Sequence, residues 1–183
     1  MLMDYFYYDK YEIVDQRESS LGRLTIHLDT VKKDDRCYPY SFLKANDSIC
    51  VLPIVDNKIL LVKQYRHALK SWEFEIPGGG LEEGEDIEMA AARELLEETG
   101  YKADSIKRLG MYYPSPGITS EKAYLCVALC HNENEIKREP LELITTGLFS
   151  ISAFEEMIRS GDFRHGMGLV AWLKYKTLNI LYQ

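Results

Sequence analysis

The chain has 183 residues, of which 46% are hydrophobic and 28% charged, and its formal net charge is −7 at pH 7. This length is enough for one globular domain with a small appendage and a sizeable core. Nucleic-acid binders usually present a concentrated basic face, so the acidic balance argues against a nucleic-acid partner. No apolar run reaches membrane-spanning length and the N-terminus lacks the features of a signal peptide, so we expect no membrane association.

Cysteine usage favours a reducing compartment. The four cysteines show neither the density of a disulfide scaffold nor a paired CxxC zinc pattern. Cys126, Cys130 and His131 could suggest a metal site, but the two cysteines lie in the apolar run 123–130, which favours buried thiols in a strand. We therefore expect a cytoplasmic location.

The first 45 residues are expected to form an antiparallel β element. Residues 21–31 alternate Leu24, Ile26 and Leu28 with polar neighbours, which is the pattern of a half-buried strand. Aromatic residues alternate in the same way over 38–42, and a charged turn is expected at 32–36.

Apolar segments dominate from Ser48 onward. Residues 48–55 and 58–65 flank Asp56-Asn57, which predicts a hairpin with a tight turn. A short strand over 72–76 ends at Pro77 and leads into a glycine loop. We expect Trp72 in the core rather than as a stacking platform for a nucleobase.

A helix is predicted over 87–99. Asp86 can accept the free N–H groups of its first turn, and Gly100 provides the left-handed residue that ends a helix. Further strands are expected near 107–113, at 123–130 and at 143–149. A capping box from Ser152 to Glu155 predicts a helix that Gly161 ends, and a final helix is expected over 167–181. This mixture predicts an α+β fold, an α/β/α sandwich with a mixed central sheet.

Three glutamates on the predicted helix form a candidate metal site. At 3.6 residues per turn, Glu94 and Glu98 lie within roughly 40° of each other, and Glu97 lies about 60° from Glu94. Like charges on one apolar flank are unfavourable unless a cation compensates them. Hard oxygen ligands suit Mg²⁺, with Mn²⁺ as the second choice. For Glu97 an ion pair with Arg93, one turn earlier, remains an equal alternative.

Residues 79–101 match the Nudix box, G-x5-E-x7-R-E-U-x-E-E-x-G-U, so the chain resembles the Nudix hydrolases. The matching positions are Gly79, Glu85, Arg93, Glu94, Leu95, Glu97, Glu98 and Gly100. One position departs, because Tyr101 stands where the family usually has an aliphatic residue. The resemblance implies the Nudix fold over 46–183 and hydrolysis of a nucleoside diphosphate linked to another moiety, X.

Segments outside the box resemble the ADP-ribose and nucleotide-sugar pyrophosphatases. Residues 62–66 look like the V-x-Q-[YF]-R strand whose Arg, here Arg66, holds the substrate, and residues 73–79 look like the E-x-P-A-G entry to the loop. Residues 113–121 look like the SPG segment that lines the substrate pocket through Ser115, Gly117 and Glu121. Arg66 could instead be a surface cation, and a Pro-Gly pair is usually only a turn.

The resemblance also implies a mechanism. Glu94, Glu97, Glu98 and the carbonyl of Gly78 would hold the metal ions, and Glu85 and Arg93 would form an ion pair that fixes the loop to the helix. A catalytic Glu from the loop after residue 130 would act as general base. Our preferred candidate is Glu142, followed by Glu139, with Glu133 and Glu135 as rivals.

The resemblance also implies a homodimer that forms through the N-terminal strands, here within residues 1–45. Each chain would donate aromatic side chains to the nucleobase pocket of its partner. ADP-ribose would give AMP and ribose 5-phosphate. Two other functions remain open: a house-cleaning hydrolase of nucleoside triphosphates or dinucleotide cofactors, and a nucleotide-sugar sensor that has lost catalysis. The intact box argues against the sensor.

Overall fold

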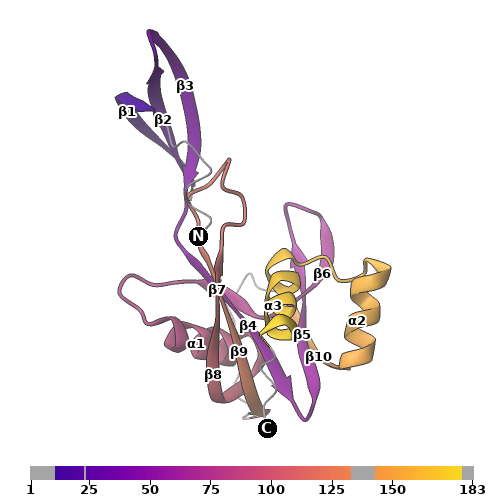
Figure 1. Cartoon of the computed structure of the whole chain (residues 1–183). Helices are drawn as coiled ribbons and strands as arrows, with labels where there is room; N and C mark the ends of the chain where they lie inside the picture. Colours follow the sequence, from indigo (N-terminus) through magenta and orange to yellow (C-terminus); the bar gives the residue numbers. More distant parts are fainter. Residues whose placement is uncertain (1–10, 23, 133–142, 179–183) are drawn as a thin grey trace. The chain divides into compact units, whose positions relative to one another are not determined.

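A computed structural model describes residues 11–22, 24–132 and 143–178 of the chain (Figure 1). The chain divides into two compact units, which are described separately. The first contains residues 1–45 together with the SPG segment, Ser115–Glu121, and the second contains 46–114 and 122–183. The sequence-based boundary between 45 and 46 did not anticipate that the SPG segment groups with the N-terminal strands.

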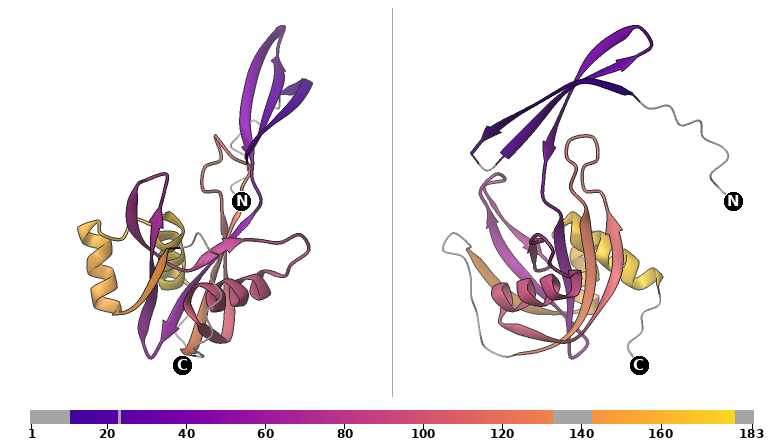
Figure 2. Two further views of the ribbon diagram at one scale, coloured as in Figure 1. Left: turned by 180° about the vertical axis from the view of Figure 1, so that it is seen from behind. Right: turned by 90° about the vertical axis from the view of Figure 1, so that its left-hand side faces the viewer.

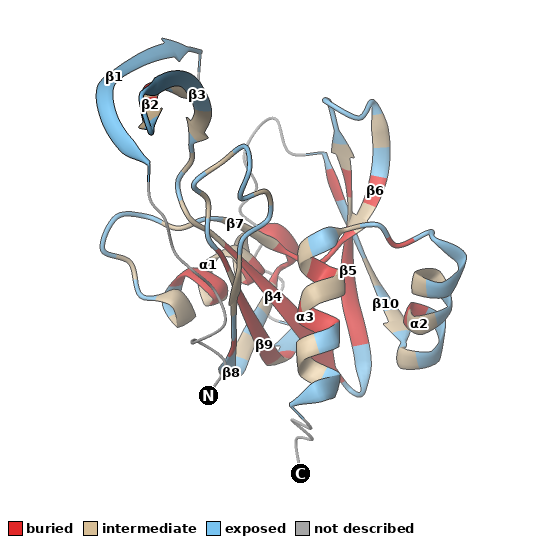
Figure 3. Ribbon diagram, turned by 45° about the horizontal axis from the view of Figure 1, so that its top comes forward, coloured by how far each residue is buried: buried red, intermediate tan, exposed pale blue. Residues whose placement is uncertain are grey.

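The first unit is a three-stranded antiparallel sheet of β1 (Glu12–Leu21), β2 (Leu24–Lys33) and β3 (Arg36–Lys44). The expected charged turn is present between β2 and β3, where Asp34 has a φ of 54°. The SPG segment pairs with the end of β3, where Leu43 N donates to Ile118 O at 2.7 Å and Leu43 O accepts from Ser120 N at 3.1 Å. Among the described residues of this unit only Asp29 and Val31 are buried, and β1 is exposed along its whole length (Figure 3).

The second unit is built on a seven-stranded mixed sheet in the order β10-β5-β4-β9-β8, with β6 paired to β5 and β7 paired to β4. The strands are β4 (Ser48–Val55), β5 (Lys58–Arg66), β6 (Ser71–Glu75), β7 (Gly78–Gly80), β8 (Tyr101–Tyr112), β9 (Ala123–Asn132) and β10 (Ile144–Ser150). The pairing of β4 with β9 is parallel, and the other pairings are antiparallel. The predicted hairpin joins β4 to β5, and its two turn residues, Asp56 and Asn57, both have positive φ.

Helices cover both faces of this sheet, as the sandwich prediction requires. Along β4, Cys50 and Leu52 pack with the residues of α2 (Ile151–Ser160) and α3 (Gly166–Thr177), whereas Ile49 and Val51 pack with those of α1 (Ile87–Thr99). Figure 2 shows α1 and α3 on opposite sides of the strands. Because β4 is buried on both faces, its sequence is a continuous apolar run rather than an alternating one.

The central strands separate at the glycine loop. β4 and β5 pair only next to their turn, at Ile54–Ile59 and Val55–Lys58. Further along, the first half of β4 pairs with β7 and the second half of β5 pairs with β6. Val51 N donates to Pro77 O at 3.0 Å, so the segment between β6 and β7 fills the opening between the two strands.

Capping residues in the sequence predicted both ends of α1 correctly, but they did not predict the start of α2. Asp86 accepts from the N–H groups of Glu88 and Met89, and Gly100 is left-handed, as predicted. The capping box was wrong: Ser150, not Ser152, caps α2 by accepting from Ala153 N at 3.1 Å. Only Ser152 has a glutamate three residues later, Glu155, whereas Ala153 follows Ser150 at that spacing. The end of β10 at Ser150, rather than the capping box, sets the start of α2.

Two side-chain predictions in this unit had opposite outcomes. Cys126 and Cys130 are buried in β9, and burial raises the pKa of each thiol to about 12, which confirms them as inert core residues. Trp72 is not in the core: its side chain is 45% exposed and contacts the edge of Tyr65.

None of the helices in the described ranges has both the length and the apolar character that crossing a membrane requires.

Candidate active site

Arg93 of α1 connects the helix to the glycine loop. Its Nε and Nη2 donate to the two carboxylate oxygens of Glu85 at 2.9 and 3.0 Å, and Nη2 also donates to Gly80 O at 3.1 Å. Nη1 donates to Glu94 at 2.7 Å and to Glu97 at 3.3 Å. The predicted ion pair between Glu85 and Arg93 is therefore present.

The charges in this network stabilise one another. Hydrogen bonding to Glu85, and then to Glu94, raises the pKa of Arg93, so the guanidinium stays charged. The same guanidinium holds the pKa of Glu85 below its usual value of 4.5. One cation thus balances several carboxylates that would otherwise repel one another.

Glu94 and Glu98 lie against consecutive residues of the glycine loop. Glu98 is buried and accepts from Gly78 N at 3.1 Å. The carboxylate of Glu94 lies over Gly79, so close that a Cβ there would come within 2.6 Å of it. Glycine at 79 leaves free the space that the Glu94 carboxylate occupies.

These oxygen donors fit the chemistry of Mg²⁺ or Mn²⁺ better than that of zinc. Within the described ranges, however, no three His, Cys, Asp or Glu side chains converge as a ready metal-binding group. Glu97 is bonded to Arg93, which is the alternative that the sequence left open for it. The metal-binding roles of Gly78, Glu94, Glu97 and Glu98 remain predictions.

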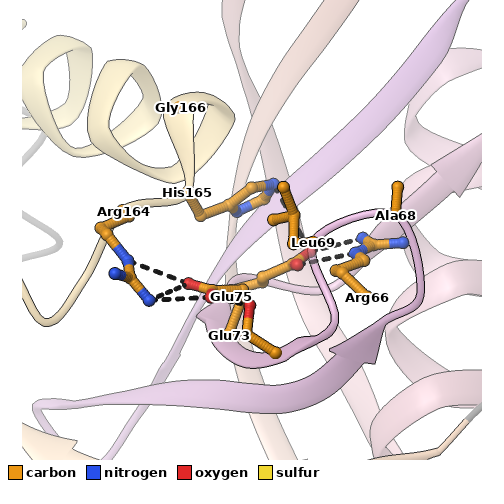
Figure 4. A pocket seen from close by; sticks show the side chains of 9 residues that line it. Arg66, Ala68, Leu69, Glu73, Glu75, Arg164, His165 and Gly166 are labelled. Atoms are coloured by element: carbon orange, nitrogen blue, oxygen red, sulfur yellow. Dashed lines mark hydrogen bonds and ion pairs between the residues drawn. The ribbon is translucent and has the colours of Figure 1, made fainter.

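Arg66, predicted to hold the substrate, is paired with a buried carboxylate at the end of β5. Its Nε and Nη2 donate to the two oxygens of Glu75 at 2.7 and 2.5 Å (Figure 4). His165, just before α3, also lies at this carboxylate, with its Nε2 at 3.8 Å from Glu75 Oε2. The bidentate pair fixes the orientation of the guanidinium, whatever it binds.

A second bidentate pair lies beside the first. Arg164 donates from Nε and Nη2 to Glu73 on β6, at distances between 2.8 and 3.1 Å, and Ser71 donates to Glu73 at 2.6 Å. These bonds, first that from Ser71 and then those from Arg164, hold the pKa of the Glu73 carboxyl below its usual value. None of Glu73, Glu75, Arg164 and His165 was predicted as a site residue from the sequence. The alternation of Glu73 and Glu75 along one strand face was the only local signal.

Other predicted site residues lie outside this unit or outside the described ranges. Ser115, Gly117 and Glu121 belong to the first unit, so their part in the site stays a prediction. The candidate general bases, Glu142, Glu139 and their rivals Glu133 and Glu135, lie outside the described residues.

Replacing Glu85 is expected to change the pH dependence of stability. The folded-state pKa of Glu85 is lower than the unfolded one, so its contribution is present above about pH 4.5 and is lost as the pH falls through the folded-state value. Glu85→Gln should lower the free energy of unfolding near pH 7 by about 1 kcal/mol. Urea denaturation between about pH 7 and pH 3 should show the two curves converging at low pH. Glu83→Gln, an exposed change on the same loop, is the control, and parallel curves for Glu85→Gln and wild type would contradict the pair's role.

Adjacent glycines should differ sharply in their tolerance of alanine. A Cβ at Gly78 would meet the carbonyl oxygen of Ile49 at 2.3 Å, which is backbone and cannot move aside. Gly78→Ala should therefore lower the free energy of unfolding by on the order of 3 kcal/mol. Gly79→Ala should cost only about 1 kcal/mol, because the Glu94 side chain can rotate away. Gly80→Ala, with open space around its Cβ, is the control, and equal losses at 78 and 79 in urea denaturation would refute this packing.

Comparison with known proteins agrees with this geometry. The NUDIX domain family matches residues 44–165. An ADP-ribose pyrophosphatase of Bacillus subtilis (strain 168) is 41% identical over 98 residues, which is 53% of each chain. A methanol dehydrogenase activator of Bacillus methanolicus is 44% identical over 82 residues, 44% of each chain. The chain thus spans about half the length of the curated relatives it matches.

A solved structure of an ADP compounds hydrolase superimposes with a TM-score of 0.85 at 22% sequence identity, covering 94% of this chain and 96% of the other. At that identity the likeness establishes the fold alone. The family match covers more than half of the chain and includes the glycine loop, α1 and the residues around Arg93. The chain belongs to the Nudix family.

Proposed function

We propose that the chain hydrolyses the pyrophosphate bond of ADP-ribose or a related nucleotide sugar, giving a nucleoside monophosphate and a sugar phosphate. The observation that carries this proposal is the arrangement of the box, in which Arg93 holds Glu85 and Glu94 while Glu98 accepts from the loop at Gly78. The relative from B. subtilis, an ADP-ribose pyrophosphatase, and the SPG segment support the choice of substrate.

The carboxylates would bind the metal on which the reaction depends. Glu94 and Glu98, with Glu97 and the carbonyl of Gly78, would hold Mg²⁺ or Mn²⁺. A bound ion of this kind neutralises pyrophosphate charge and lowers the pKa of a bound water. The protein's own residues supply position: Arg93 fixes the loop against α1, and Glu75 orients the guanidinium of Arg66 toward the substrate.

The general base is proposed to be Glu142, with Glu139 as the second candidate. A base on that loop would orient the attacking water for in-line displacement at phosphorus. Ser115, Gly117 and Glu121 would line the substrate pocket. The four free cysteines are compatible with a reducing compartment, and we propose the cytoplasm.

A substrate panel tests the activity. Turnover should be highest on ADP-ribose or ADP-glucose, compared with GDP-mannose, NADH, FAD and oxidised deoxynucleotides, and chelation of the metal should abolish it. Glu98→Gln keeps an acceptor for Gly78 N but loses the charge, so turnover should fall at least about a hundredfold, which is about 2.7 kcal/mol. Glu88→Gln on the same helix is the control.

Three results of the panel would count against the proposal. Preferential turnover of triphosphates or dinucleotide cofactors would favour the house-cleaning alternative. Tight binding of ADP-ribose without turnover would favour a sensor. Near-wild-type turnover by folded Glu98→Gln would refute the metal assignment.

We also propose that the chain forms a homodimer through the N-terminal strands. This three-stranded sheet buries little of its own apolar surface, and within the described residues β1 pairs with β2 alone, which leaves its other edge to a further strand. Large exposed side chains occur on both faces, among them Ile13, Leu28, Tyr38 and Tyr40. A second copy of the chain would cover them.

Sedimentation velocity tests the dimer. The wild-type protein should sediment with twice the mass of one chain, and the double substitution Leu28→Glu and Tyr40→Glu should give monomers because it places charge on both faces. Lys33→Glu, an exposed change at the end of β2, is the control. A wild-type monomer at every concentration would contradict the proposal.

A further inference from the structure

The two arginine–glutamate pairs form one pocket of about 650 Å³ (Figure 4). Its floor is one face of β6, with Ser71, Glu73 and Glu75. One wall is the end of β5 and the turn after it, with Arg66, Ala68 and Leu69. The other wall is the end of the connection from α2 to α3 and the first residue of α3, with Arg164, His165 and Gly166. The volume is within the range of pockets that hold small ligands.

The charges of this pocket are already balanced. Each guanidinium is held by a carboxylate that is at most 10% exposed, Arg66 by Glu75 and Arg164 by Glu73. A phosphate would bring further negative charge next to Glu73 and Glu75, whose charges the two guanidiniums already balance. A charged ligand is therefore a poor fit.

Hydroxyl groups fit the same surroundings. Carboxylate oxygens accept from a ligand O–H, and the remaining N–H groups of a paired guanidinium can donate to its oxygen without breaking the ion pair. A hydroxyl can accept one hydrogen bond and donate another at the same time. One ligand hydroxyl can therefore bridge His165 Nε2 and Glu75 Oε2, which lie 3.8 Å apart.

His165 presents a defined donor there. Its Nδ1 accepts from Ile76 N at 3.2 Å, so the neutral ring carries its proton on Nε2. Burial, with a further contribution from Arg66, lowers the pKa of His165, which Glu75 opposes, so the ring is neutral near pH 7. On the opposite wall Leu69 is 65% exposed and offers an apolar surface to the C–H face of a sugar ring.

The pocket adjoins the carboxylates of the box. Ile76 N bonds to His165, and Gly78 N bonds to Glu98, so the two sites are anchored two residues apart on one extended segment. Two residues span at most about 7 Å. A group attached to a pyrophosphate at the box would reach the pocket.

From these contacts we infer that the pocket is a subsite for the polyhydroxylated group X of the substrate. Arg164, His165 and Glu73 form hydrogen bonds with the hydroxyl groups of the sugar there. The inference rests on the proposed function.

The test compares ADP-ribose with the methyl ester of ADP, which has a pyrophosphate and a nucleoside but no sugar as X. The readout is the ratio of kcat/KM for ADP-ribose to that for the methyl ester. Arg164→Met removes the guanidinium but leaves the Ser71 bond to Glu73, and it should lower the ratio about tenfold. Leu69→Trp replaces an exposed side chain with a larger one that fills the pocket, so it should also lower the ratio of kcat/KM values. This variant serves as the test if Arg164→Met does not fold.

Arg159→Met is the matched control, because Arg159 is an exposed, paired arginine on α2 outside the pocket, and its ratio should not change. An unchanged ratio in both pocket variants, or equal losses on the two compounds, would overturn the subsite. If wild type hydrolysed neither compound, the proposed function would fail separately. The subsite would then be judged from the ratio of Kd values for the same two compounds by calorimetry, with the same expected fall and the same overturning result.

Discussion

The organisation of the candidate site depends on the guanidinium of Arg93. It donates to Glu85, Glu94, Glu97 and the carbonyl of Gly80, and so joins the first and last parts of the loop to the helix that follows. Several carboxylates can be held close together at a half-buried site only because this cation lies among them. Glu98, deeper on the same helix, is held by a backbone N–H of the loop instead. The loop and helix therefore behave as one rigid support for the acidic side chains.

The second constraint is the opening between β4 and β5, which the loop fills. The segment from Ile76 to Gly78 meets β4 through Val51, α1 through Glu98 and the start of α3 through His165. Edge-to-face aromatic contacts among Phe154, Phe163 and Trp172 join α2, α3 and the connection between them, which carries Arg164 and His165. One short segment thus links Glu98 of α1 to the pocket between β6 and α3.

The sequence predicted those features that depend on neighbours along the chain. The cap and end of α1, the Asp56-Asn57 turn and the pairing of Glu85 with Arg93 all lie within eight residues of their partners. The sandwich followed from the order of apolar segments. The pairing of Arg164 with Glu73 joins residues 91 apart, and that of His165 with Ile76 joins residues 89 apart. No pattern of neighbouring residues encodes contacts between residues so far apart in the sequence. The exposure of Trp72 was missed for a similar reason, because it depends on which face of β6 is covered in the folded protein.

The most direct measurement is anomalous diffraction from crystals of the protein grown with Mn²⁺. If the glutamates of α1 exist to bind a divalent ion, manganese should be bound by carboxylate oxygens of Glu94 and Glu98, while Arg93 retains its two bonds to Glu85. Manganese found only at other positions, or its absence from ordered crystals with Glu94 and Glu97 still bonded to Arg93, would contradict the account. The acidic cluster would then be a structural ion-pair network.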